Sequence, residues 1–313
     1  MAGHGPPRLP IDLERKIFEM VVTSPMSSKA STPRDYPPAE ALVCMLVAWR
    51  VKHWVEPFIH RVICLSRLAD TQCIMRAEGF PSIWVEPLLD RIHTKGPSFF
   101  RYTTHIFLEN WASETKAFGT VVDACPSVHT LFFNPARGDP ENLPILNRMQ
   151  SLTRLAFTSV LFPDGPIDFS QPLFRNLTHL EVAQNWSPAV SAHIGGHLAL
   201  LPNLTHFAFW SDHIDIPVNS QIVENTRLKC IVWIIADAIA RKGIPETHPS
   251  AEDDRFVMVR VKNLRRAWFR GAAGRRDHWQ LAEEFIAKKR RGEIGREQYC
   301  TVDPDDPGWN LRC

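Results

Sequence analysis

Apolar residues recur at a nearly constant interval through the middle of the chain. Five hexapeptides share a core of the form L-x-x-L followed by an apolar residue two places on, and a sixth fits with Thr103 in its first place. Their central residues lie 25, 24, 25, 27 and 24 positions apart. This interval predicts stacked units that each hold a short strand and a return segment. The central residues are Ile106, Leu131, Leu155, Leu180, Phe207 and Ile231.

Alternation within these strands predicts two faces. Leu180 and Val182 are expected to point into the core, whereas His179 and Glu181 are expected to point outward. Stacked strands would align the outward residues in an exposed band, which is the usual binding surface of such proteins and which its histidines would make sensitive to pH. We expect a target protein to bind there, at His105, Phe107, Phe132, Arg154, His179, Glu181 and His206.

The pattern becomes helical ahead of the repeats. Leu9, Leu13, Ile17 and Val21 recur at intervals of four, which predicts an amphipathic helix. A Pro- and Ser-rich insert at 23–38 cannot continue that helix. A second helix is expected from 39 to 57, followed by a strand at 60–66 and a helix at 83–92.

The remaining pattern predicts helical returns at 111–124 and 187–201, a last strand at 256–261 and a C-terminal helix that contains Trp279. Three parts follow from this order. They are a helical region at 1–60 with the insert at 23–38, a repeat domain at 61–261, and a basic helix and tail at 262–313.

Two families share features with this chain. The repeat period and the L-x-x-L-x-L cores resemble leucine-rich repeats. The segment RLPIDLERKIF at 8–18 resembles the opening of an F-box, and VAWRVKHWVEP at 47–57 resembles its closing helix. Together with RFVMVRV and FIAKKRRGEI near the end, the whole is similar to a largely uncharacterised group of fungal F-box-like proteins with degenerate leucine-rich repeats. The predicted fold is therefore α/β, an irregular repeat solenoid with an F-box-like N-terminal cap.

The resemblance implies a function without chemistry. F-boxes bind the Skp-type adaptor of a cullin–RING ubiquitin ligase, and the repeats behind them commonly capture the protein to be ubiquitylated. Carried over by position, the adaptor-binding residues would be Leu9, Pro10, Leu13, Ile17, Phe18, Val47 and Trp54. Apolar anchors at helical spacing are suited to burial in the groove of a partner.

Two other hypotheses remain open. The N-terminal helices can instead be a cap that packs Leu13, Ile17 and Trp54 on the first repeat, which would leave a protein-interaction scaffold with no ligase role. The chain can also be a binder of polyanions, because residues 255–313 hold 14 Lys+Arg against 8 Asp+Glu. The overall balance of 36 against 34 does not favour a nucleic-acid partner. The candidate cations are Arg265, Arg266, Arg270, Arg275, Arg276 and the run 288–291.

Composition and motifs point away from catalysis and cofactors. The sequence holds no nucleophile elbow, phosphate-binding glycine loop or paired acids in a motif, so we expect no enzyme and no cofactor. His193 and His197 lie four apart without a third ligand, and the 7 cysteines form no C-x-x-C pair, so we expect no metal. The longest uncharged runs fall short of the roughly 18 residues that span a bilayer. MAGHGPPRLP lacks the features of a secretory signal, which predicts a cytoplasmic or nuclear location.

Overall fold

The protein is built around one parallel sheet. The computed structural model describes residues 9–23, 39–66, 68–78, 80, 85–96, 100–110, 115–158, 161–162, 166–183, 188–210, 218, 220–236 and 249–302. Within these residues nine strands lie side by side in chain order. The strands are β1 (Val62–Ser66), β2 (His105–Glu109), β3 (Thr130–Asn134), β4 (Arg154–Phe157), β5 (His179–Val182), β6 (His206–Trp210), β7 (Cys230–Ala236), β8 (Phe256–Val261) and β9 (Cys300–Val302).

The predicted repeat strands and their register are confirmed. The six repeat segments form β2 to β7, and each central residue pairs with the next, from Ile106 with Leu131 to Phe207 with Ile231. The α/β class is therefore as predicted. The strand expected at 60–66 is β1, and the last predicted strand is β8. β9 lies in the segment predicted as a basic helix and tail, so that segment also contributes to the sheet.

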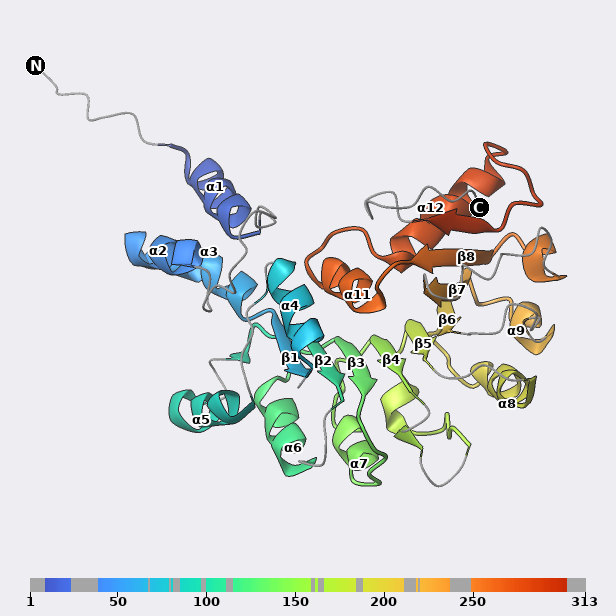
Figure 1. Cartoon of the computed structure of the whole chain (residues 1–313), viewed down its shortest axis with the longest axis horizontal. Helices are drawn as coiled ribbons and strands as arrows, with labels where there is room; N and C mark the ends of the chain where they lie inside the picture. Colours follow the sequence, from blue (N-terminus) through green and yellow to red (C-terminus); the bar gives the residue numbers. More distant parts are fainter. Residues whose placement is uncertain are drawn as a thin grey trace, which may run out of the picture.

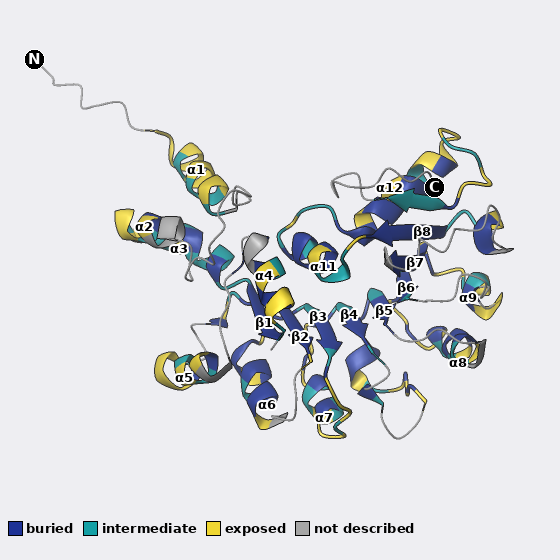
Figure 2. Ribbon diagram, viewed as in Figure 1, coloured by how far each residue is buried: buried dark blue, intermediate teal, exposed yellow. Residues whose placement is uncertain are grey.

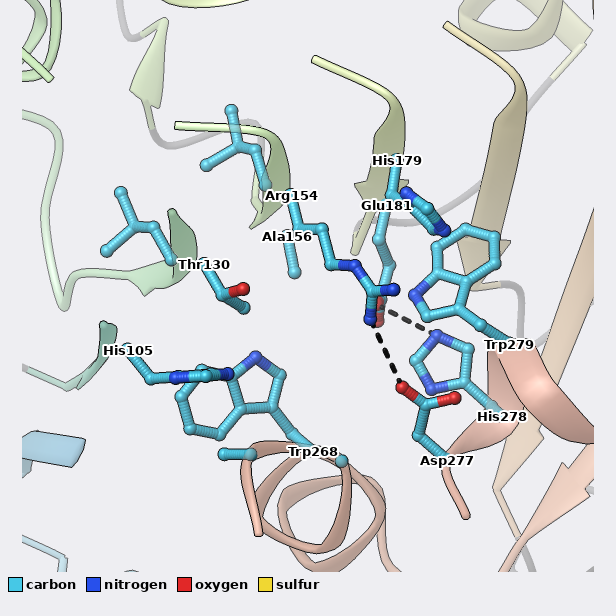
Figure 3. Close-up of a pocket in the computed structure, with 14 residues that line it drawn as sticks. His105, Thr130, Arg154, Ala156, His179, Glu181, Trp268, Asp277, His278 and Trp279 are labelled. Atoms are coloured by element: carbon cyan, nitrogen blue, oxygen red, sulfur yellow. Dashed lines mark ion pairs between the residues drawn. The ribbon is translucent and has the colours of Figure 1, made fainter. Parts of the chain in front are cut away.

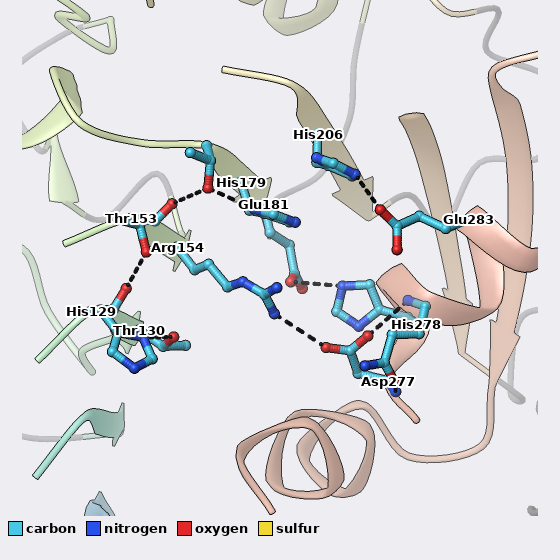
Figure 4. A network of polar contacts seen from close by, with 12 residues as sticks. His129, Thr130, Thr153, Arg154, His179, Glu181, His206, Asp277, His278 and Glu283 are labelled. Carbon is cyan, nitrogen blue, oxygen red and sulfur yellow. Dashed lines mark hydrogen bonds and ion pairs between the residues drawn. The ribbon is translucent and has the colours of Figure 1, made fainter. Parts of the chain in front are cut away.

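A threonine ladder fixes the register where the strands begin. The hydroxyl of Thr153 donates to the carbonyl of His129 at 3.2 Å, Thr178 donates to Thr153 at 3.1 Å, and Thr205 donates to Thr178 at 3.3 Å. Each bond joins one strand entrance to the preceding one, because the threonine occupies the same place in successive repeats. Figure 4 shows the bond from Thr153 to His129. A shift of one strand by a single residue would break these bonds.

Most return segments are helical and lie outside the arc of strands (Figure 1). They are α5 (Val85–Lys95), α6 (Thr115–Ala124), α7 (Asn142–Leu146), the 3-10 helix η3 (Pro172–Phe174), α8 (Pro188–Leu198) and α9 (Ser220–Glu224). The strand side chains that face them form the main core together with the central residues of the repeats. Leu108, Phe133, Phe157, Val182 and Phe209 are examples of these fully buried side chains.

Three further helices lie on the other side of the sheet, which we call the inner face because it lies within the arc (Figure 1). They are α4 (Ala69–Ala77), α11 (Leu264–Ala272) and α12 (His278–Arg290), and the 3-10 helix η4 (Pro249–Glu252) lies beside β8. A capping box starts α12, in which the carboxylate of Asp277 accepts from the backbone of Gln280 at 2.9 Å. Asn263 caps α11, because its side chain accepts from the backbone N–H of Arg266.

The N-terminal part forms three helices, α1 (Ile11–Thr23), α2 (Ala39–Val47) and α3 (Trp49–Ile59). The single helix predicted at 39–57 is wrong in one respect, because Ala48 is extended (φ −163°, ψ 154°) and divides it. The three helices share a small core of Cys44, Val51, Val55 and Ile59. In Figure 1 they project from the β1 end of the sheet. Among the described residues, none of the helices has the length and apolar character needed to cross a membrane.

Candidate functional site

The predicted target-binding band lies on the inner face, and most of it is covered. The rings of Phe107 and Phe132 stack with centroids 4.3 Å apart, and Trp268 of α11 meets Phe107 edge-on at 5.1 Å. Figure 2 shows these strands and the sheet-facing side of α11 as buried. The expectation of exposure is therefore wrong for several members of the band. The buried members are His105, Phe107, Phe132, Glu181 and His206.

The sequence does carry a signal for this second layer. The strands HIFLE of β2 and CIVWIIA of β7 are apolar at consecutive positions rather than at alternate ones. Such runs are typical of parallel strands that are covered on both faces. Phe107 and Phe132, which we expected to be exposed, and Val232 lie in this second core.

Buried carboxylates hold α11 against the first strands. Glu109, at the end of β2, accepts from the hydroxyl of Thr71 at 2.7 Å and pairs with Nε of Arg265 at 2.8 Å. Glu78 follows α4 and pairs with Arg266 at 2.6 Å and Arg275 at 2.5 Å. Burying a carboxylate is costly unless it is paired, so these guanidinium groups are part of the fold.

The same pairs account for much of the basic C-terminal part. Besides the three arginines just described, Arg276 pairs with Glu284 at 2.9 Å and Arg291 with Glu293 at 2.5 Å. The ammonium of Lys289 is buried and donates to the carbonyl of Ala251 at 2.9 Å. Six of the cations that we considered for a polyanion surface thus have partners within the protein.

A cavity lies between the inner face and the C-terminal helices. Its volume is about 40 Å³, room for a few water molecules or one small polar group. Figure 3 shows the side chains that surround it, contributed by β2 to β5, by α11 and by the start of α12. The residues that matter for its chemistry are Arg154, Glu181, Trp268, Asp277, His278 and Trp279.

The polar groups of this cavity form a short network (Figure 4). Nη1 of Arg154 lies 3.5 Å from Oδ2 of Asp277, and Nε2 of His278 lies 3.3 Å from Oε2 of Glu181. The other oxygen of Glu181 accepts from the indole of Trp210 at 2.5 Å. His278 was not predicted from the sequence, because its approach to Glu181 depends on how α12 packs on the sheet.

The histidines of the band differ in protonation from the expectation. Burial, reinforced by nearby cations, lowers the pKa of both His105 and His179 to about 2. Burial also lowers the pKa of His206, against the opposing effect of its hydrogen bond to the carboxylate of Glu283. These imidazoles are neutral near pH 7, so the predicted sensitivity to pH near neutrality is wrong for them. Burial alone would lower the pKa of His278, but the charges of Glu181 and Asp277 raise it above the ordinary value.

The inner face keeps a few accessible members of the band. The side chain of Arg154 is 44% exposed, and His179 is half-buried. His179 stacks on His206 with ring centroids 4.1 Å apart, and Trp279 meets His179 edge-on at 5.1 Å. Arg154 is therefore the predicted target-binding residue that solvent reaches best.

A different surface is open on the N-terminal helices. Leu9, Leu13, Ile17 and Val47, which the F-box resemblance identifies as adaptor-binding residues, are 50–59% exposed. Pro10 is exposed as well. Phe18 and Trp54 differ, because they pack partly against the core of the three helices. Their predicted place on the docking surface is therefore at most its edge.

The open surface is larger than the motif indicated. Ten of the eleven large apolar residues that are exposed in the described part of the chain lie in residues 9–49. Exposed apolar patches of this kind mark interaction sites in soluble proteins. Figure 2 shows the exposed colour along α1. The residues that the motif did not identify are Ile11, Met20, Val21, Val43, Leu46 and Trp49.

The alternative role as a cap finds no support in the packing. In the described residues the helices α1 to α3 make their extensive contacts with one another. Leu13 and Ile17 are half exposed rather than packed on the first strand, and Trp54 packs within the three helices. Among the described residues the apolar surface is thus open.

No site for a metal ion emerges in the described residues. His193 and His197 do share α8, as their spacing predicted. Nε2 of His193 lies 2.9 Å from the carbonyl of Ile167, and Nδ1 of His197 lies 2.7 Å from the carbonyl of His193. Both rings therefore bind the backbone.

Comparison with known proteins gives no family assignment. No family model matches the chain, and no curated protein matches it. Function is therefore inferred from the geometry of the two surfaces described above.

Proposed function

We propose that this protein is an F-box-like substrate receptor of a cullin–RING ubiquitin ligase. Helices α1 to α3 would bind the Skp-type adaptor, and the sheet behind them, an irregular leucine-rich-repeat-like solenoid, would carry the target protein. The observation that supports this most is the concentration of exposed apolar side chains on α1 to α3. A receptor of this kind acts in the cytoplasm or nucleus.

The physical reason is the cost of leaving such residues in water. Burial of a leucine or isoleucine side chain contributes about 1.5–3 kcal/mol. Leu13 and Ile17 are one helical turn apart on α1 and both are about half exposed, so a partner groove can take them together. The inner core of Cys44, Val51 and Val55 keeps the three helices together while their outer side chains stay available.

The mechanism would be tethering rather than chemistry. A receptor that holds the adaptor at one end and a target at the other raises the local concentration of the target near the ligase. The regular strand register of β2 to β7 supports a rigid spacer between the two ends. The conjugation chemistry would belong to the other subunits of the ligase.

The test is co-purification of the full chain with the Skp-type adaptor. We expect the intact chain to bind, and Leu13→Asp and Ile17→Asp each to weaken binding at least about tenfold, because each places a charge in the apolar contact. Leu200→Asp is the matched control, since Leu200 is an equally exposed leucine (59%) far from α1. Circular dichroism verifies folding.

Two results would count against the proposal. A folded intact chain that does not bind the adaptor would leave the alternative, a repeat scaffold for protein interactions without a ligase role. Equal loss of binding in the Leu200→Asp variant would show that the contact does not involve α1.

A further inference from the structure

The cavity at Arg154 has unused hydrogen-bonding capacity. A guanidinium group carries five N–H donors. In the described structure that of Arg154 makes one ion pair, at 3.5 Å, and charge-assisted hydrogen bonds are normally 2.7–2.9 Å. The flat donor face of Arg154 is therefore open on the cavity side (Figure 3).

His278 adds a second incomplete donor at the same place. Its side chain is 3% exposed and lines the cavity. Neither ring nitrogen has a hydrogen-bond partner in the described structure, although Nε2 lies within ion-pair distance of Glu181. Buried polar atoms normally have partners, so Nδ1 of His278 is available to donate to a group bound in the cavity.

The carboxylates beside the cavity are, in contrast, already engaged as acceptors. Asp277 accepts from the backbone of Gln280, and Glu181 accepts from Trp210 at 2.5 Å while pairing with His278. The cavity therefore lacks acceptors for its two donor groups, Arg154 and His278. A ligand that satisfies Arg154 and His278 together must therefore bring oxygen acceptors.

The walls restrict the shape of that ligand. Trp268 and Trp279 enclose the cavity from α11 and α12, and the neutral rings of His105 and His179 lie on the strand side. A planar group with two oxygens matches the fork of a guanidinium and needs little room between aromatic walls. The volume of about 40 Å³ suits a single such group.

We propose that this cavity binds a carboxylate group, with Arg154 and His278 as its donors. The cavity is the accessible remnant of the predicted target-binding band, so the carboxylate would belong to a target peptide. That last step rests on the proposed function, whereas carboxylate binding itself does not. A carboxylate can also come from a small free acid, and the experiment separates the two sources.

The experiment follows the two cavity tryptophans by ¹⁹F NMR of the full chain labelled with 5-fluorotryptophan. Trp268→Phe and Trp279→Phe identify the two signals. The probes are sodium acetate, acetyl-Ala-Ala with a free carboxylate, and a blocked peptide with a central Asp, all compared with acetyl-Ala-Ala-amide and with NaCl at equal ionic strength. We expect saturable shifts of both signals with acetate and with a carboxylate peptide, and none with the amide or NaCl.

Variants show whether Arg154 is responsible. We expect Arg154→Gln to abolish the shifts and Arg154→Lys, which keeps the charge but loses the fork, to weaken binding about tenfold. Arg148→Gln is the matched control, because Arg148 is similarly exposed (48%) and pairs with Asp123 on the outer side. Binding to the control variant should be unchanged.

Three results would overturn the proposal or part of it. Absence of any saturable shift, or shifts that persist in Arg154→Gln, would remove the carboxylate site. Acetate binding without peptide binding would remove the assignment to a target. None of these results depends on α1 to α3, so this test and the adaptor test fail independently.

Discussion

The two ends of the chain both form amphipathic helices, but the C-terminal helices bury their apolar residues whereas the N-terminal helices expose many of theirs. In α11, Trp268 and Phe269 are buried against the inner face of the sheet. In α1 and α2, Leu13 is about half exposed and Leu46 is 86% exposed. The difference lies in what each end has to pack against.

The C-terminal helices find both an apolar surface and matching charges within the chain. Phe107 and Phe132 supply the apolar surface, and Glu78 and Glu109 supply carboxylates for the arginines of α11 and the loop after it. Much of the apolar surface of the N-terminal helices has no such counterpart in the described structure. A helix whose apolar face is unmatched in its own chain is suited to a partner.

The largest difference between the two ends is expected when one apolar residue is truncated at each. We expect Phe269→Ala to lower the free energy of unfolding by about 3–5 kcal/mol, because Phe269 is fully buried and contacts the ring of Phe107. Leu46→Ala should change it by less than about 0.5 kcal/mol. Urea denaturation followed by circular dichroism measures both. Similar losses at the two ends would contradict the distinction.

The next largest effect is a fall in the free energy of unfolding in acid, caused by the buried histidines of the inner face. The pKa of both His105 and His179 is lowered to about 2, so the unfolded chain takes up protons first as the pH falls below 6.5. Stability is therefore present above pH 6.5 and decreases below it. We expect a loss of about 1 kcal/mol per histidine between pH 6 and pH 5.

His278 acts in the opposite direction in its own pH range. Its pKa is raised, so its contribution to stability is complete below the pKa of the unfolded chain and is lost as the pH rises through the pKa of the folded one.

The acid loss expected from His105 and His179 is measured by urea denaturation at pH 6 and pH 5. The variant His105→Gln should reduce that loss by about half. An unchanged loss in His105→Gln would show that other groups cause it.

A smaller effect is expected from the carboxylate of Glu78. Glu78→Gln weakens the pairs with Arg266 and Arg275 and should cost about 1–2 kcal/mol, a moderate value because both guanidinium groups keep access to water. Glu293→Gln breaks an equally short pair with Arg291 in which both side chains are at least half exposed. That control should show no measurable change in urea denaturation.

The smallest effect compares two helical glycines. A Cβ at Gly271 would lie 2.9 Å from Asp277, whereas one at Gly196 would approach only the side chain of Gln221 at 3.5 Å. We expect Gly271→Ala to destabilise by about 1 kcal/mol and Gly196→Ala to stabilise by about 0.5 kcal/mol. Thermal unfolding of both variants measures the difference in sign. A gain at Gly271 would show that Asp277 can move without cost.

The sequence predicts the sheet well because its information is local and periodic. The interval of the central residues determines β2 to β7 and their register. The break between α2 and α3 at Ala48 was not predicted, because no Gly or Pro marks it. The helical spacing of Leu13 and Ile17 predicted that they share a helix, and both lie on α1 with about half of each side chain exposed.

The inner face could not be predicted in the same way. Arg265 lies 156 residues from Glu109, and Arg275 lies 197 residues from Glu78. No periodic pattern links positions that far apart. The cavity follows from the same packing, because α12 brings His278 to Glu181. The apolar runs of β2 and β7 are a signal of a second layer that our prediction of an exposed band overlooked, and they do not specify which segment supplies that layer.

The distance in sequence between the inner face and its cover also matters during synthesis. Phe107 and Phe132 leave the ribosome long before Phe269, and at about 5–20 residues per second the interval is roughly 10–30 s. During that time a nascent chain with β1 to β4 complete still exposes a row of aromatic rings and two unpaired carboxylates. Molecular chaperones recognise such surfaces, and a product that terminates before residue 264 would keep them permanently.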